Sequence, residues 1–283
     1  MDILTNPFRQ LLKGDRVPFG TWVMSGATST AEALGSLGFD WILVDMEHTP
    51  IDVRDAYHIL QALGGTPAAP IVRIPWNDQV LVKRLMDAGA QSLMFPFVQN
   101  VEEARAAVSF TRYPLPGDAK AGRRGFAGFH RGNRYGTVPD YARRANEAAF
   151  VIVQIETPEA AAQLEEIAAV EGVDAIFLGP ADLAANMGHV GNMEEKSVQA
   201  KVAEVAKRCR AIGKPCGIVG PTPEIVQRYI GYGYDYVAIA SDMGMMMAQA
   251  RAFMAAVKPA LAKSFSTNKS FSTDKSSSTK KRA

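Results

Sequence analysis

Eight short runs of apolar, mostly β-branched or aromatic residues recur along the 283-residue chain, and amphipathic segments separate them. The runs begin at Phe19, Asp40, Pro70, Ser92, Phe150, Ala175, Pro215 and Asp235. Most are apolar throughout rather than alternating, as expected for parallel strands that are buried on both faces. A strand–helix unit repeated eight times at this length predicts one (β/α)8 barrel, which typically takes ~250 residues. An open doubly wound sheet is the alternative.

The segments between the runs carry helix signals. Residues 52–63 space their apolar side chains three and four apart, which is typical of an amphipathic helix. Thr-Pro-Glu occurs at 157–159 and again at 222–224, where Thr can cap a helix that begins with Pro. Residues 4–13 predict a short helix that closes the amino-terminal end of the barrel. The long segment 112–136, rich in Gly, Arg and aromatic residues, predicts a functional or mobile loop after the fourth strand.

The composition limits the kinds of binding partner and the cellular compartment that the sequence suits. The net charge of +2 gives no strong attraction to nucleic acid or to a membrane, and no run of about 18 apolar residues predicts a membrane span. Residues 264–283 hold five Lys or Arg and one Asp and repeat SFSTNK as SFSTDK, so we expect a disordered tail after a barrel domain of residues 1–263. With only Cys209 and Cys216, a reducing cytoplasm is expected.

Polar side chains follow several predicted strands at the end where a (β/α)8 barrel carries its site. Asp45 and His48 follow the second strand, Arg73 ends the third, Glu156 the fifth and Asp182 the sixth. The carboxylates Glu156 and Asp182, with few His and no nearby Cys, suit a hard divalent cation such as Mg²⁺, Mn²⁺ or Co²⁺. Each also has a structural interpretation, at the start or the cap of a helix. No organic cofactor is expected.

Three further residues have both a chemical and a structural interpretation. Arg73 lies in an apolar run, so it needs a partner: it either forms a structural ion pair or holds a substrate oxygen and stabilises an enolate. His48 is either a loop or capping residue or a base, with Asp45 as a candidate orienting partner. Gly179 lets a ligand approach the backbone, and the helix that follows offers free N–H groups to a carboxylate.

Lysine is missing from the predicted strand ends. Lys83, Lys201 and Lys207 lie in predicted helices, and Lys214 precedes the seventh strand. An enzyme that forms a Schiff base with a carbonyl substrate needs a lysine at the catalytic end of a strand. The sequence therefore favours a metal over an imine as the electron sink.

Several stretches resemble the HpcH/HpaI family of metal-dependent class II pyruvate aldolases over roughly residues 17–257, among them GFDWILVDMEH, PIVRIPWND, LMDAGAQSLMFPFV, VIVQIETPEA and VEGVDAIFLGPADLAANMG. The family includes 4-hydroxy-2-oxoheptanedioate aldolase and 2-dehydro-3-deoxyglucarate aldolase. The resemblance implies a carbon–carbon lyase that cleaves a 4-hydroxy-2-oxo acid into pyruvate, or an analogue such as hydroxypyruvate, and an aldehyde. It also implies a divalent metal and a homo-oligomer, commonly a hexamer.

The resemblance assigns roles to individual residues. His48 matches the base supported by Asp45, Arg73 the enolate-stabilising arginine, and Glu156 and Asp182 the metal ligands. Substrate contacts are implied for Gln154, for the turn Gly179, Pro180, Ala181 and Asp182, and for Val219 and Ser241 near the variable end of the substrate. Asp87 resembles an aspartate that reaches a neighbouring subunit's site. The segment PLPGDAKAGRRG is longer than the family's YPPxGxRG, an insertion that could alter aldehyde selection.

Alternatives remain open at this level. Oxaloacetate decarboxylation would pass through the same enolate. A CoA-ester lyase of related fold is a second rival, although no adenine-nucleotide site is evident, and a catalytically silent binding barrel is a third. Arg123, Arg124, Arg131 and Arg134 make the long loop basic, which suits an aldehyde bearing a carboxylate but equally suits solvated or interface positions.

Overall fold

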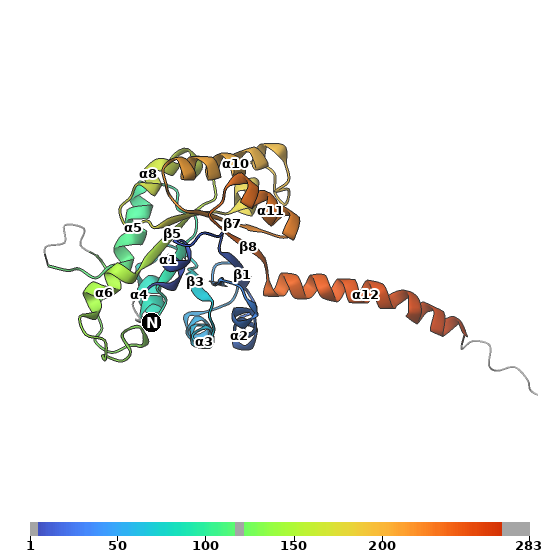
Figure 1. Cartoon of the computed structure of the whole chain (residues 1–283), viewed down its shortest axis with the longest axis horizontal. Coiled ribbons are helices and arrows are strands. Elements are labelled where there is room, and N and C mark those ends of the chain that lie inside the picture. The colour runs from blue at the N-terminus through green and yellow to red at the C-terminus, as the bar shows by residue number, and fades with distance from the viewer. Residues whose placement is uncertain (1–4, 117–121, 268–283) are drawn as a thin grey trace, which may run out of the picture. The chain divides into compact units, whose positions relative to one another are not determined.

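Eight parallel strands, hydrogen-bonded in chain order, form a closed barrel (Figure 1). The computed structural model describes residues 5–116 and 122–267. The strands are β1 (Phe19–Val23), β2 (Trp41–Asp45), β3 (Ala69–Arg73), β4 (Ser92–Phe95), β5 (Phe150–Ile155), β6 (Ala175–Leu178), β7 (Cys216–Gly220) and β8 (Tyr236–Ser241). The predicted (β/α)8 barrel is confirmed, and the pairing of β1 with β8 excludes the open sheet.

A short helix precedes β1, and the other helices follow the strands. They are α1 (Pro7–Leu11), α2 (Thr28–Leu37), α3 (Val53–Leu63), α4 (Gln79–Asp87), α5 (Val101–Thr111), the 3₁₀ turn η1 (Arg131–Asn133), α6 (Tyr141–Ala148), α7 (Pro158–Ala162), α8 (Leu164–Ala168), α9 (Pro180–Asn186), α10 (Lys196–Ala211), α11 (Pro223–Tyr232) and α12 (Asp242–Thr267). The Thr caps are confirmed, since Thr157 and Thr222 each accept a backbone N–H three residues on. The first helix is shorter than the predicted 4–13, and residue 4 lies outside the described residues.

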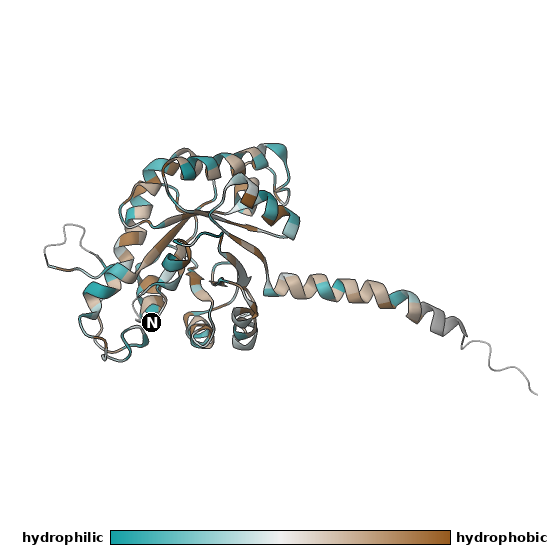
Figure 2. Cartoon of the chain, in the orientation of Figure 1, coloured by the Kyte–Doolittle hydropathy of each residue, from teal (hydrophilic) through white to brown (hydrophobic). Residues whose placement is uncertain are grey.

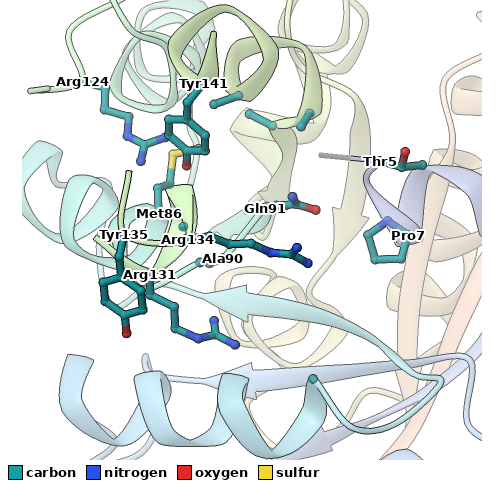
Figure 3. Close-up of a pocket in the computed structure, with 16 residues that line it drawn as sticks. Thr5, Pro7, Met86, Ala90, Gln91, Arg124, Arg131, Arg134, Tyr135 and Tyr141 are labelled. Atoms are coloured by element: carbon teal, nitrogen blue, oxygen red, sulfur yellow. The ribbon is translucent and has the colours of Figure 1, made fainter. Parts of the chain in front are cut away.

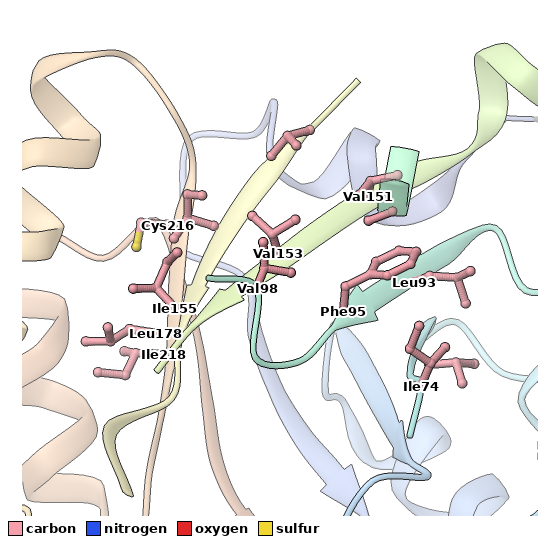
Figure 4. Close-up of a cluster of buried hydrophobic side chains, with 14 of the residues drawn as sticks. Ile74, Leu93, Phe95, Val98, Val151, Val153, Ile155, Leu178, Cys216 and Ile218 are labelled. Carbon is pink, nitrogen blue, oxygen red and sulfur yellow. The ribbon is translucent and has the colours of Figure 1, made fainter. Parts of the chain in front are cut away.

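The inside of the barrel is filled by one set of side chains. Phe8 of α1 closes the amino-terminal end, and its ring centroid lies 5.8, 5.4 and 5.2 Å from those of Trp41, Phe150 and Tyr236. Strand side chains that alternate with this inner set face outward to the helices, as Val151, Val153 and Ile155 do on β5 (Figure 4). Both faces of each strand are therefore apolar, which explains the continuous apolar runs in the sequence. Figure 2 shows the strands as mostly brown, that is hydrophobic, and the helices as a mixture of brown and teal.

Contacts divide the chain into two units, Met1–Met243 and Gly244–Ala283. The second unit holds most of α12, a 26-residue helix that contains Pro259. The tail expected from residue 264 begins inside this helix, and its residues 268–283 lie outside the described part of the chain. Within the described ranges, no helix is both long enough and apolar enough to cross a membrane.

Candidate active site

The inner set of side chains becomes polar where the strands end. On β5 the inward positions run Phe150, Ile152 and then Gln154, and on β3 they end at Arg73. Asp45 of β2 is the Cα partner of Arg73 in the parallel ladder. The strand register therefore brings polar groups to the carboxyl-terminal end of the barrel, which is where barrels of this kind hold their sites.

Arg73 is buried among groups that fix its plane. Its Nε donates to Asp45 Oδ1 and its Nη2 to Asp45 Oδ2, both at 2.9 Å. Its Nη1 lies 2.8 Å from Glu47 Oε2, and its guanidinium carbon is 4.3 Å from the centroid of the Trp22 ring. Five N–H groups serve three carboxylate contacts, so hydrogens on both Nη atoms are left for a ligand.

His48 lies beside this cluster, in a contact different from the predicted one. Asp45 Oδ1 accepts the backbone N–H groups of Glu47 (3.1 Å) and His48 (3.5 Å) as well as the Arg73 Nε–H, and Oδ2 accepts from Arg73 Nη2. The imidazole Nε2 instead lies 3.9 Å from Glu47 Oε2. Asp45 therefore orients the main chain of His48, and Glu47 is the acid next to the ring.

Glu156, the residue after β5, is fully buried. Its Oε1 accepts from Gln154 Nε2 and its Oε2 from the backbone N–H of Phe97, both at 2.8 Å. Gly179 makes room for it, because a Cβ on residue 179 would lie 2.4 Å from Oε1. Burial, and then the negative charge of Glu47, raise the pKa of Glu156 to about 8.

Asp182 approaches Glu156 from α9. Asn186 Nδ2 donates to the carbonyl of Asp182 (2.9 Å) and to that of Glu156 (3.2 Å), so α9 is joined to the end of β5. Gly179 is the N-cap of α9 and gives it no side-chain hydrogen bond, and Pro180 opens the helix. The carboxylates of Asp182 and Glu47 are both close enough to raise the pKa of Glu156.

Of the remaining predicted site residues, all but Asp87 lie at this end of the barrel. Val219 on β7 packs against the inner set, Ser241 ends β8, and Ala181 is exposed on α9. Asp87 ends α4 and contacts residues of the long loop: its Oδ1 accepts from Arg124 Nη2 at 2.7 Å and lies 3.6 Å from His130 Nε2.

The arginines of the long loop lie at the opposite end of the barrel. Arg124, Arg131 and Arg134 line a cavity of about 470 Å³ that also borders Pro7 of α1 and Gln91, which precedes β4 (Figure 3). Arg131 donates to the carbonyls of Ala88 (2.7 Å) and Leu60 (3.2 Å), at the ends of two helices. These three arginines thus do not face the acidic cluster of their own chain.

Two residues of the cluster carried no assigned role in the sequence. Glu47 contacts both Arg73 and His48, and its position in the run Asp-Met-Glu-His was the available signal. Trp22, an inward residue of β1, stacks on Arg73, and nothing in an apolar strand distinguishes it from core. Lys83 lies in α4 and Lys201 in α10, as predicted.

The acidic side chains at this end of the barrel form a set of oxygen donors. Within residues 5–116 and 122–267, no three His, Cys, Asp or Glu side chains are placed to hold an ion by themselves. Four carboxylates, those of Asp45, Glu47, Glu156 and Asp182, nevertheless interact around one guanidinium, that of Arg73. This excess of negative charge suits a hard cation that keeps water or ligand oxygens in its remaining positions.

Comparison with known proteins adds independent findings. The sequence profile of the HpcH/HpaI aldolase/citrate lyase family matches residues 18–249. Over 248 residues the chain is 54% identical to a 2-dehydro-3,6-dideoxy-6-sulfogluconate aldolase of Pseudomonas putida, covering 88% of this chain and 95% of the relative. It is 43% identical to a 5-keto-4-deoxy-D-glucarate aldolase of Salmonella arizonae, covering 87% and 94%. A crystal structure of an HpcH/HpaI aldolase/citrate lyase family protein from Burkholderia cenocepacia J2315 superposes with a TM-score of 0.86 at 38% identity, covering 90% of this chain and 100% of that one.

Proposed function

The chain belongs to the HpcH/HpaI aldolase/citrate lyase family and is a carbon–carbon lyase, and from that premise we propose that it is a divalent-metal-dependent class II aldolase. It would cleave a 4-hydroxy-2-oxo acid reversibly into pyruvate and an aldehyde. The observation that carries the proposal is the buried cluster in which Arg73 lies among the acidic side chains of three strand ends.

Glu156 and Asp182 would hold the metal, Mg²⁺, Mn²⁺ or Co²⁺. Glu156 is buried, fixed by two donors and crowded by other carboxylates, so a cation at this point would relieve their repulsion. The cation would supply positive charge beside the oxygen on which enolate charge develops. Gly179, Pro180 and Ala181 would flank the carboxylate of the bound 2-oxo acid.

Arg73 would hold the ketone oxygen of the substrate. The guanidinium is held in one plane by Asp45 and the Trp22 ring, so it needs little reorganisation when charge moves onto that oxygen. When the C3–C4 bond breaks, its electron pair forms the C2–C3 double bond of the enolate and the ketone π electrons move to the oxygen beside Arg73. A proton delivered to C3 then gives pyruvate.

His48 would take the proton of the 4-hydroxyl as the aldehyde forms. The ring is more than half exposed and lies next to Glu47, so it can exchange the proton with solvent after each turnover. Val219 and Ser241, at the ends of β7 and β8, would contact the aldehyde portion.

A substrate with an acid group at its far end is proposed for the aldehyde portion. The Pseudomonas putida relative is named for a sulfonated sugar acid, and the Salmonella arizonae relative for a sugar diacid. We put 2-dehydro-3,6-dideoxy-6-sulfogluconate first, because that relative is the more similar of the two. Its cleavage would give pyruvate and a three-carbon hydroxyaldehyde that bears the sulfonate.

The test is a retro-aldol screen in which pyruvate release is followed with lactate dehydrogenase and NADH. The panel holds 2-dehydro-3,6-dideoxy-6-sulfogluconate, 5-keto-4-deoxy-D-glucarate, 4-hydroxy-2-oxoheptanedioate and oxaloacetate. We expect the highest kcat/KM for the sulfonated acid. If the protein released pyruvate from oxaloacetate and from no other member of the panel, its activity would be that of a decarboxylase and not of an aldolase.

Self-association into a homo-oligomer, six subunits by resemblance, is part of the proposal. The first unit taken alone has an apolar groove of about 270 Å³ lined by Val17, Phe19, Pro223, Val226, Gln227, Ile230, Val237 and Ile239. Large apolar side chains also recur along α12. In such an assembly Asp87 would serve a neighbouring subunit's site. Light scattering should give the mass of six chains, and a monomer at micromolar concentration would contradict this.

A further inference from the structure

Both oxygens of Glu156 are held by donors from different parts of the chain. Gln154, two residues earlier on β5, donates its side-chain amide to Oε1. The donor to Oε2 is the main-chain N–H of Phe97, 59 positions away in the turn after β4. A carboxylate with both oxygens bonded and no exposed surface has one orientation.

Phe97 makes its contact from an unusual backbone conformation. Its φ is +53°, in the left-handed region that bulky L-residues seldom adopt. The next residue, Val98, donates its N–H to the carbonyl of Gln154 at 3.2 Å, so the chain after β4 continues along β5. The left-handed turn at Phe97 therefore directs one N–H at the Glu156 side chain, which follows β5, and the next N–H at the β5 backbone.

Strained backbone that the surrounding fold maintains is often a device of a functional site. We propose that Phe97 is a positioning residue: its left-handed backbone aims its N–H at Glu156 Oε2 and, together with Gln154, fixes the carboxylate in the orientation that binds the metal. The role belongs to the main chain of Phe97 and not to its phenyl ring. This inference rests on the proposed function, in which Glu156 is a metal ligand.

Three substitutions of Phe97 separate its main chain from its side chain. Phe97→Gly and Phe97→Ala both keep the N–H, whereas Phe97→Pro lacks it and cannot adopt a positive φ. We expect the Gly and Ala variants to bind Mn²⁺ within about 3-fold of wild type, and the Pro variant to bind about 10- to 100-fold more weakly. Binding is measured by titration calorimetry on full-length, metal-stripped protein.

The Gly and Ala variants also test the conformation itself. They differ only in the Cβ, and glycine adopts a positive φ freely. Phe97→Gly should therefore melt at a higher temperature than Phe97→Ala, the reverse of their order at an ordinary extended position. A higher melting temperature for the Ala variant would overturn the left-handed assignment.

Gln154→Met tests the same clamp without touching the turn, should Phe97→Pro fail to fold. It removes the donor to Oε1 at similar side-chain volume, and we expect Mn²⁺ affinity to fall about 10- to 100-fold. Wild-type affinity in this variant would overturn the clamp. If instead wild type and Glu156→Gln bind Mn²⁺ equally, the proposed function itself fails.

Discussion

The ion pair between Arg73 and Asp45 should contribute to stability and to catalysis in ways that one pair of substitutions can separate. Asp45 has no exposed surface and Arg73 almost none, and two 2.9 Å hydrogen bonds join them. Arg73→Met leaves the Asp45 carboxylate buried without its counter-charge. Asp45→Asn combined with Arg73→Met removes both charges.

The magnitude follows from the contacts that remain. Breaking a buried pair by removing one partner costs about 3–5 kcal/mol. Asp45 keeps the backbone N–H groups of Glu47 and His48, so we expect the lower end, about 3 kcal/mol, for Arg73→Met. The double variant carries no unpaired charge from this pair, and it should recover at least half of that loss, about 1.5 kcal/mol.

Activity should not recover with stability. Without the guanidinium, charge on the ketone oxygen loses a fixed donor, a loss that typically costs at least about 100-fold in rate. We therefore expect both Arg73→Met and the double variant to release pyruvate at least about 100-fold more slowly than wild type, with metal in excess.

Urea unfolding followed by circular dichroism, at one protein concentration and in EDTA, gives the free energies of unfolding. The lactate dehydrogenase assay gives the rates. An Arg73→Met variant as stable as wild type would refute the buried-pair reasoning. A double variant with near wild-type kcat would refute the role of Arg73 in stabilising the enolate.

Three further outcomes follow from the site. Gly179→Ala puts a Cβ 2.4 Å from Glu156 Oε1 and should weaken Mn²⁺ binding at least about 10-fold in calorimetry, while Gly231→Ala, with open space around its Cβ, should not. Folding raises the pKa of Glu156 to about 8, so the folded state is stabilised when this carboxyl is protonated. In urea titrations, metal-free wild type should therefore lose stability relative to Glu156→Gln as the pH rises from about 4.5 to 8. Parallel curves of stability against pH for the two proteins would contradict this. His48→Asn should lower kcat at least about 100-fold in the pyruvate assay without changing the affinity for Mn²⁺. If kcat and Mn²⁺ affinity fell by the same factor, His48 would be a metal ligand and not the base.

The barrel was predictable because its strands are buried on two faces. Runs such as the one from Phe150 are apolar throughout, so each strand could be located from composition alone, and parallel pairing followed from the alternation with helices. The end of the first helix was not predictable to the residue. The division at Gly244 was not predictable either, because it lies near the start of α12 and not at the change in composition at residue 264.

The residues that form the site could be predicted from the sequence, but the contacts between them could be predicted less well. Arg73 ends a strand, and Glu156 and Asp182 follow strands, so topology alone predicts that they meet. The partner of Asp45 depends on strand register, which pairs it with Arg73 rather than with the His48 ring. Phe97 could not have been found, since no Gly or Asn marks its positive φ.

The claim that a metal held by Glu156 is required for carbon–carbon cleavage has a direct test. Protein stripped with EDTA is assayed for pyruvate release from 2-dehydro-3,6-dideoxy-6-sulfogluconate, before and after Mg²⁺, Mn²⁺ or Co²⁺ is added, beside Glu156→Gln. We predict that stripping abolishes turnover, that at least one of the three cations restores it in wild type, and that none restores it in the variant. Turnover that persists in EDTA would contradict the account.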